Sequence, residues 1–466
     1  MHCHILNLRD ADGPAFVVRH VTDGDEGSTL LDGASGVATW LASLPNYLVT
    51  SSAEKELAWL KKITLEVQGQ IQNFCEEADR NQAGIFFAAE GRQAFGFTSN
   101  RTRNAARLLS LYPEVDIFTP SMVDFYEGKR DYSDPRVLVN YYSQLNIATL
   151  GRFLPLVSFN PTRAFEEGGR ASRNKYLNLI RESIEEKGFV GVKIHPSTGF
   201  APIHNREYGC PNSIRQHLVH IPDAEADFYD EILNDLFVYC RGADIPILTH
   251  SGPGVAANGK CMNNPDTDLS TRSNSPALWA KAIKRADLND RDIWGNAVPT
   301  SAKLTVCFAH LAGGFEHKKG SLSPHPWLLS LDDIMRNNSR VYVDLSDQSE
   351  MFESRTGAIK KEYASLFTSF LADNPYVANR LMYGSDWHMP GAAMVGSKYF
   401  PGMKELIPYN LRDRTLGLNA AEFFGLAKGR RTRGRLEQFY RRNGVSIAQV
   451  SWVTKVDRAM DDRAAS

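Results

Sequence analysis

Short apolar runs alternate with helical patterns along most of this 466-residue chain. From residue 114 onward the apolar runs lie at 114–120, 153–159, 189–195, 245–250, 303–310, 339–345 and 380–386. The helical patterns lie at about 134–149, 165–187, 223–241, 275–287, 328–337, 357–373 and 415–427. Near-continuous apolar strands that alternate with helices are typical of a parallel sheet covered by helices on both faces. The chain is therefore predicted to be an α/β protein.

The number of strand–helix units narrows this prediction. A short run that ends at His4 adds a first strand, so eight strands are each followed by at least one helix. Eight such units predict a closed (β/α)8 barrel, the TIM barrel, in which active sites lie at the carboxyl ends of the strands. The alternative is a doubly wound open sheet. It is disfavoured because no glycine-rich G-x-G-x-x-G follows any of the strands.

Two segments extend this barrel, which is predicted to span residues 1–428. A long insertion after strand one covers about 8–110; its first part, 8–50, is rich in Gly, Asp and Ser and reads as an irregular loop. Such a loop is either a lid or an excursion without function. Apolar residues at helical spacing predict a helix from Ser51 to about Arg80. A basic extension at 429–466 is expected to form a helix that packs outside the barrel or at a subunit contact.

Residues that can bind a metal ion occur at several predicted strand ends. One residue separates His2 from His4, so in a strand their side chains point the same way and can both bind one ion. Four further candidates close later apolar runs: Lys193, His250, His310 and Asp386. Because the carboxyl ends of barrel strands meet at one face, these side chains are expected to converge in one pocket.

This pattern resembles the metal signature of the amidohydrolase superfamily, which has His-X-His on the first strand, Lys on the fourth, His on the fifth and sixth, and Asp on the eighth. The segments VGVKIHP, THSG, AHLAGG, GSDWH and LNAAEFFGL are most similar to its amidohydrolase-related branch. That branch also contains non-hydrolytic decarboxylases of aromatic carboxylates. The resemblance covers roughly residues 1–428 and does not specify a substrate.

The resemblance implies a role for each ligand candidate. His2, His4, His250 and Asp386 would surround one ion and leave a position open for water or substrate. Imidazole and carboxylate ligands suit zinc. Asp386 lies where the family places the base that takes a proton from the metal-activated water. In relatives with one metal, the histidine of the sixth strand, here His310, polarises the substrate.

Lys193 bears on the number of metal ions. In relatives with two metals, a lysine at the end of strand four carries a carbamate that bridges the ions, and His250 and His310 would then bind the second one. Lys193 can instead contact a substrate carboxylate. Because Lys193 and His195 share one face of the strand, either side chain can reach the site. One zinc ion is favoured, because the flanking segments resemble the amidohydrolase-related branch.

Several residues near the strand ends are weaker candidates. Lys193, His195, Arg272, Trp387 and His388 are predicted to bind a small-molecule substrate, possibly an anionic one, although a solvated arginine is the favoured interpretation of Arg272. Asp344 and Asp347 on strand seven are as consistent with structural hydrogen bonding as with a site role. Cys3 is expected in the core, since it points away from His2 and His4.

The composition excludes several classes of protein. Apolar residues make up 42% and charged residues 23% of the chain, as in globular proteins, and the net charge of −1 gives no support for a nucleic-acid or membrane partner. The six cysteines form no CxxC pair, which argues against a disulfide scaffold. No signal peptide or bilayer-spanning apolar run is apparent. A cytoplasmic enzyme is expected, and a homo-oligomer is left open.

The position of His2 directly after the first Met is unusual for a strand end. A strand that lacks its first half loses ladder hydrogen bonds, each contributing about 0.5–1.5 kcal/mol. Either strand one is very short or the natural chain starts upstream of Met1, and we expect the second.

Three functions compete at this stage. The first is metal-dependent hydrolysis of an amide, ester or lactone, with Asp386 as general base. The second is non-oxidative decarboxylation of an aromatic or unsaturated carboxylic acid on the same metal site. The third is a binding barrel without activity, and the intact ligand set argues against it.

Overall fold

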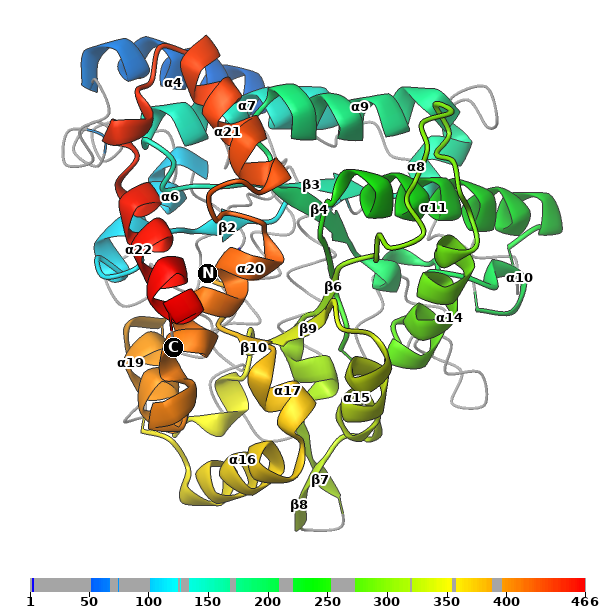
Figure 1. Cartoon of the computed structure of the whole chain (residues 1–466), viewed down its shortest axis with the longest axis vertical. Helices are drawn as coiled ribbons and strands as arrows, with labels where there is room; N and C mark the ends of the chain where they lie inside the picture. The colour runs from blue at the N-terminus through cyan, green and yellow to red at the C-terminus, as the bar shows by residue number, and fades with distance from the viewer. Residues whose placement is uncertain are drawn as a thin grey trace, which may run out of the picture.

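The strands of the protein stand in the middle of the molecule and its helices lie around them (Figure 1). A computed structural model describes residues 2–3, 52–67, 74, 101–124, 126, 134–167, 173–208, 221–252, 273–318, 321–353, 358–387 and 396–465. The predicted loop at 8–50 lies outside these residues, as do His4, Arg272 and His388.

Eight parallel strands follow one another in space in the same order as in the sequence. Six form one sheet: β3 (Leu156–Phe159), β4 (Gly191–Ile194), β5 (Ile247–Thr249), β6 (Val306–Phe308), β9 (Val341–Asp344) and β10 (Leu381–Met382). The two others, β1 (His2–Cys3) and β2 (Thr119–Pro120), pair in parallel. Isolated parallel bridges from Phe118 to Phe153 and from Ser121 to Leu156 join β2 to β3.

The two ends of this series lie close together. A ladder between β10 and β1 is not among the pairings of the described residues, but Asp386 and Tyr383, which follow β10, interact electrostatically with the thiol of Cys3 in β1. The first strand therefore lies near the segment that follows the eighth strand. The strand order and the parallel pairing agree with the predicted (β/α)8 fold.

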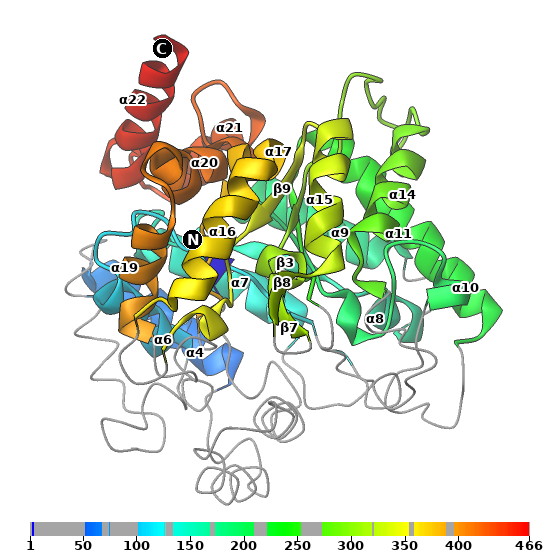
Figure 2. The ribbon, with the colours of Figure 1, turned by 90° about the horizontal axis from the view of Figure 1, so that it is seen from below.

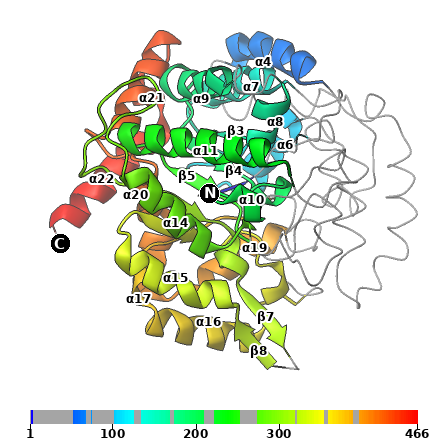
Figure 3. The same ribbon diagram turned by 90° about the vertical axis from the view of Figure 1, so that its right-hand side faces the viewer.

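The helices that follow the strands surround them, as Figure 3 shows for α9, α11, α14, α15 and α16. Their bounds are α7 (Pro135–Ala148), α9 (Arg173–Glu186), α11 (Asp223–Ala243), α14 (Pro276–Asp287), α15 (Pro326–Asn337), α16 (Lys361–Asp373), α17 (Pro375–Asn379) and α20 (Asn419–Phe423).

Several of these helices start at a polar residue followed by proline. The side chains of Asp134, Asn160, Ser275 and His325 each accept a hydrogen bond from a backbone N–H in the first turn of the helix that follows. Proline suits the first helical position, because it has no N–H to leave unpaired there and its φ is already helical. These dipeptides fix where the chain leaves each strand-end loop and turns back along the barrel.

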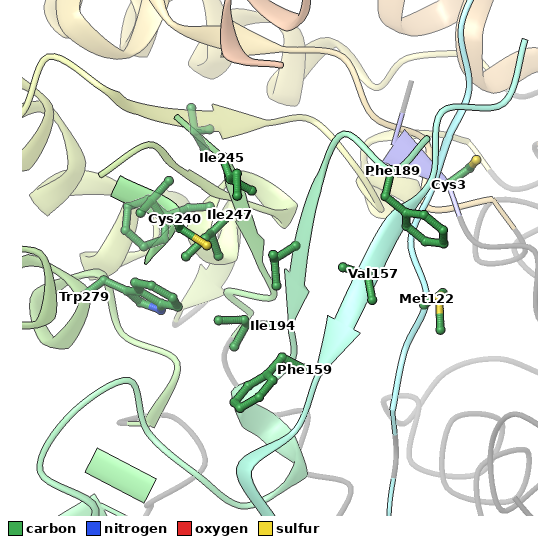
Figure 4. Close-up of a cluster of buried hydrophobic side chains, with 14 of the residues drawn as sticks. Cys3, Met122, Val157, Phe159, Phe189, Ile194, Cys240, Ile245, Ile247 and Trp279 are labelled. Carbon is green, nitrogen blue, oxygen red and sulfur yellow. The ribbon is translucent and has the colours of Figure 1, made fainter. Parts of the chain in front are cut away.

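Two hydrophobic layers separate the inside of the barrel from its outside. Between strands and helices lies an outer layer that includes Val157, Phe159, Ile194, Ile247 and Trp279 (Figure 4). The alternating residues Leu156, Leu248, Cys307, Tyr342 and Met382 belong to a second, inner cluster. This division follows from the period of two along each strand. Cys3 is fully buried in the outer layer, which confirms its predicted core position.

Segments between strands contain elements that the periodicity did not predict. The expected helix at 165–187 is two helices, α8 (Pro161–Glu166) and α9. Between β6 and α15, β7 (Phe315–Lys318) and β8 (Ser321–Pro324) form an antiparallel hairpin. Phe315 makes edge contacts with the rings of Tyr363, Phe367 and Phe370 of α16. Those contacts come from a distant segment, so sequence pattern alone could not predict them.

The insertion after β1 contributes helices to the outside of the barrel. Helix α4 (Ala53–Val67) lies within the range predicted as helical and packs against α7 (Figure 1). Helix α6 (Arg101–Leu111) was not predicted. The carboxylate of Glu56 in α4 accepts from the guanidinium of Arg101 at 2.9 Å and from its backbone N–H at 2.7 Å. This buried pair joins the two helices at the start of α6.

The C-terminal extension closes the amino-terminal end of the barrel. Figure 2 shows α21 (Arg431–Arg442) and α22 (Ser451–Ala465) at one end of the molecule and the hairpin β7–β8 at the other. Phe439, Tyr440 and Trp452 share the inner cluster with Leu154 and Val190, which precede β3 and β4. The predicted helical extension is confirmed, whereas its division from the barrel at residue 429 stays a prediction.

The basic side chains of α21 bond to the chain itself. Arg435 and Arg442 donate to the carbonyl oxygens of Ala243 and Glu185, and Arg433 forms an ion pair with Asp457 at 2.9 Å. Much of the basic character of this segment therefore serves contacts between the extension and the barrel. None of the described helices combines the length and apolar character needed to cross a membrane.

We expect Phe439→Ala to lower the free energy of unfolding by about 3–5 kcal/mol, because a buried aromatic ring is lost and leaves a cavity. The ring is 1% exposed and packs directly against Gly188. Chemical denaturation measures the effect. The matched control is Arg441→Ala, an exposed change on the same helix that should shift stability by no more than about 0.5 kcal/mol. Equal stability of the two variants would show that the extension does not stabilise the barrel.

Candidate functional site

The carboxyl ends of the strands bring together histidines and acids from distant parts of the chain. His250 follows β5 directly and His310 follows β6 by two residues. Asp386 follows β10, while Ser346 and Asp347 follow β9. The backbone N–H of His250 donates to the carbonyl oxygen of Ile194, so the ladder between β4 and β5 continues up to the site.

Three imidazole rings are in direct contact. His195 stacks on His250 with ring centroids 4.3 Å apart, and His250 lies 4.6 Å from His310. Nδ1 of His250 and Nε2 of His310 share a hydrogen bond of 2.9 Å. Nδ1 of His195 is 2.6 Å from Oγ of Ser197. The predicted candidates at the ends of strands four, five and six thus share one site.

His310 and two carboxylates form a group of the size that a single metal ion requires. One ligand atom each from His310, Asp347 and Asp386 lie within 4.8 Å of one another. Nδ1 of His310 is 4.0 Å from Oδ2 of Asp386. His310 and Asp386 are each 8% exposed. This group combines two predicted candidates with Asp347, which the sequence left undecided between a structural and a site role.

The position of His310 is fixed by Asp344 of β9 and by Ser346, which follows β9. Its backbone N–H lies 3.2 Å from both Oδ1 of Asp344 and Oγ of Ser346, and its ring Nδ1 is 3.2 Å from the same Oγ. Ser346 also donates to Asp344 through its hydroxyl and its backbone N–H. Asp344 therefore belongs to the framework that orients His310, the structural reading that the sequence allowed.

The protein environment keeps the His250 ring neutral. Burial, followed by the neighbouring His195, His310 and Lys193, lowers the pKa of His250 well below its ordinary value, while Asp386 opposes the shift. A neutral imidazole is the form that binds a metal ion. Nε2 of His250 is buried and has no hydrogen-bond partner among the described residues. That nitrogen thus offers a lone pair or a proton to a ligand.

Lys193 lies inside the barrel below the histidines. It is 1% exposed, and it pairs in register with Leu248 of the inner cluster. Burial lowers the pKa of its amine, whereas the nearby Asp386 and Asp344 raise it. Lys193 therefore faces the two acids at the ends of β10 and β9.

The three residues of the His–Asp–Asp group share an unusual backbone conformation. The φ angles are +60° at His310, +49° at Asp347 and +48° at Asp386. Left-handed conformations of this kind are strained for most residues and are concentrated at functional sites. Each of these three residues thus lies in a sharp turn shortly after its strand.

Other predicted residues lie nearby or outside the described part of the chain. The backbone of His2 is paired in β1, at the strand position the sequence predicted. The side chain of Trp387 is 5% exposed and packs in the outer hydrophobic layer, so contact with a substrate would use little of its surface. The remaining candidates His4, Arg272 and His388 are outside the described residues.

A second feature of the molecule is a pocket that is lined partly by aromatic and aliphatic side chains. It encloses about 750 Å³ between α22, α20 and the segment before β2, and its described lining includes Tyr383, Leu416, Phe424 and Trp452. The described lining contains no histidine. This pocket therefore does not include the histidines of the candidate site.

The chain belongs to the amidohydrolase family, whose profile matches residues 118–426. This range contains every strand from β3 to β10 and each described candidate ligand except His2. The family consists of metal-dependent enzymes, which agrees with the candidate His/Asp metal site. No curated protein matches the chain.

Solved structures similar to this chain include a putative hydrolase, a decarboxylase and an isomerase. A putative metal-dependent hydrolase from Lactobacillus casei is 14% identical, with 91% of this chain and 94% of that chain covered and a TM-score of 0.45. A 5-carboxyvanillate decarboxylase from Novosphingobium aromaticivorans with bound manganese is 11% identical, with 81% and 95% covered and a TM-score of 0.38. A uronate isomerase from Thermotoga maritima is 12% identical, with 91% and 93% covered and a TM-score of 0.39.

Removal of metal by a chelator is expected to lower the melting temperature of the purified protein. An ion that binds only the folded state stabilises it by about 2.7 kcal/mol when its concentration is 100 times its dissociation constant. Thermal denaturation with and without chelator, together with metal analysis, measures this. Adding zinc back should restore the melting temperature in wild type but not in His250→Ala. A melting temperature that does not respond to chelator or zinc would argue against a metal site.

Proposed function

We propose that the protein is a hydrolase that uses a metal-activated water to cleave an amide, ester or lactone. The observation that supports it best is the convergence of His250, His310 and Asp386 at the carboxyl ends of three barrel strands in a member of the amidohydrolase family. The barrel places active sites at this face. A buried cluster of neutral imidazole and carboxylate has the chemistry that such a reaction needs.

One zinc ion, held by His2, His4, His250 and Asp386, is the metal content we propose. Nitrogen and oxygen ligands of this kind suit zinc, and three or four of them leave a position for water or substrate. A bound ion would act as a Lewis acid that lowers the pKa of water to about 7 and polarises a carbonyl group. The neutral state of His250 supports its role as a ligand.

Asp386 is the proposed general base. Its carboxylate lies beside the imidazole of His310 and at the mouth of the eighth strand, where it can take a proton from water and pass it to the leaving group. His310, oriented by Asp344 and Ser346, would polarise the substrate carbonyl as a hydrogen-bond donor. These two residues are the proposed catalytic pair.

Lys193, His195, Arg272, Trp387 and His388 are the proposed substrate contacts. The burial of Lys193 beside Asp386 supports a role for its amine within the site. Burial also favours the neutral amine, which is the form that a carbamate requires, so Lys193 would bridge two ions if the site were binuclear. In that case His310 would bind the second ion.

A decarboxylase is the second candidate function. Lys193 and His195 lie on the side of β4 that faces the cluster, where they could hold the carboxylate of an aromatic or unsaturated acid. The same metal ligands would serve this reaction. A barrel that only binds is not favoured, because His250, His310 and Asp386 are all present and meet in one place.

A substrate panel separates the two reactions. Zinc-loaded protein is incubated with amides, esters, lactones, and aromatic and unsaturated acids, and released amine, alcohol and CO2 are measured. Hydrolysis is expected, and chelator should abolish it. Release of CO2 without hydrolysis would replace the first function with the second. If the metal-loaded protein turned over no compound in either class, the proposed enzyme activity would lose its support.

Asp386→Asn is expected to keep bound metal and to lose turnover by about 10²- to 10⁴-fold, the usual contribution of general acid–base catalysis. The retained histidines explain the retained metal. Metal analysis and steady-state rates on the panel substrate measure the two effects. Asp373→Asn, an exposed change in α16, is the matched control and should leave both unchanged.

His310→Asn distinguishes one metal from two in the same experiment. In a one-metal site the variant should keep its ion and slow the reaction, whereas in a two-metal site it should lose one ion. Near wild-type turnover by Asp386→Asn would contradict the assignment of Asp386 as the base.

A further inference from the structure

An acid follows the seventh strand, which carries no ligand in the metal signature of the family. Asp347 lies three residues after β9 ends, on the same face of the barrel as His310 and Asp386. One of its carboxylate oxygens lies within 4.8 Å of ligand atoms of both residues. We propose that Asp347 is an additional carboxylate ligand of the metal ion, which rests on the proposed metal-dependent function.

The charges around Asp347 favour a cation at this position. Asp386 and Glu350 are the charged groups that act on its carboxylate, and both are negative. Its contact with a side chain is a single one of 3.5 Å, donated by Oγ of Ser349. No ion pair of Asp347 occurs among the described residues. Two carboxylates held this close repel each other unless a cation or a shared proton lies between them.

Two lysines near the site interact with other acids. Lys193 interacts with Asp386 and Asp344, and Lys360 interacts with Glu350. A divalent ion bound by Asp386 and Asp347 would offset the repulsion between these two carboxylates.

The loop that carries Asp347 is held in place by several hydrogen bonds. Tyr399 donates from its hydroxyl to the carbonyl oxygen of Leu345 at 2.7 Å and accepts from the N–H of Gln348 at 3.0 Å. The amide of Gln348 donates to the carbonyl oxygens of Ser346 and Asp347. The side-chain oxygen Oε1 of Gln348 occupies the space that a Cβ atom at Gly314 would need. The Asp347 carboxylate is thus presented on a fixed loop.

A second carboxylate would change the preference of the site among metals. Imidazole suits zinc well, whereas carboxylate oxygen also suits harder ions such as Mn2+. Removing Asp347 should therefore weaken the binding of Mn2+ more than that of zinc. The consequence is a prediction about affinity and selectivity that does not depend on knowing the substrate.

Asp347→Asn tests the proposal, with Glu350→Gln as its matched control. Both changes remove one negative charge from the same loop, but only the first removes a proposed ligand atom. Asparagine tolerates the left-handed backbone that position 347 requires, so the variant should fold. Affinities for Zn2+ and Mn2+ are measured by competition with a chelator. We expect Asp347→Asn to bind Mn2+ at least 10-fold more weakly and Glu350→Gln to stay within about threefold of wild type.

The outcomes separate this inference from the proposed function. Wild-type protein that binds neither ion overturns the metal-dependent function itself. Wild-type protein that binds metal, with Asp347→Asn unchanged or weakened only as much as Glu350→Gln, overturns the role of Asp347 alone. If Asp347→Asn does not fold, a crystal of zinc-loaded wild type decides the question. A carboxylate oxygen of Asp347 at about 2.0–2.2 Å from the ion would support it, and a clearly longer distance would contradict it.

Discussion

The parallel pairing of neighbouring strands is the constraint on which the site depends. The ladders align Val192 with Ile247, Ile247 with Val306, and Val306 with Val341, so strands far apart in the sequence end at a similar level. Side chains placed one to three residues beyond these ends then have only one face on which to meet. This explains how His250, His310 and Asp347, which are separated by tens of residues, come within reach of one another.

The chain adopts left-handed backbone conformations just after several strands, and their unfavourable free energy must be offset by other interactions. Residues in the left-handed region are destabilised by about 1–3 kcal/mol each when they are not glycine. At His310 the bonds from its backbone N–H to Asp344 and Ser346 hold the turn, and Tyr399 holds the loop before Asp347. Strain and polar burial are thus gathered at the carboxyl face of the barrel.

In contrast to the polar carboxyl face, the amino-terminal face of the barrel is apolar. There the aromatic residues of α21 and α22 extend the inner hydrophobic cluster beyond Leu154 and Val190. The layer of Leu248, Cys307 and Tyr342 lies between that end and the polar site. Stability is therefore provided largely at the amino-terminal end and between strands and helices, which leaves the loops of the carboxyl face available for ligand binding.

The amino-acid sequence alone determined the fold class and most of the described candidate ligands. Apolar runs of strand length show in the local pattern, and His250, His310 and Asp386 are the last residues of three of these runs. Local pattern could not decide whether Asp347 is a structural residue or part of the site. Nor could it predict α6 or the hairpin β7–β8, because these depend on contacts such as Glu56 with Arg101 and Phe315 with Phe367. Only the tertiary structure decides such cases, since the partners that stabilise them are distant in the sequence.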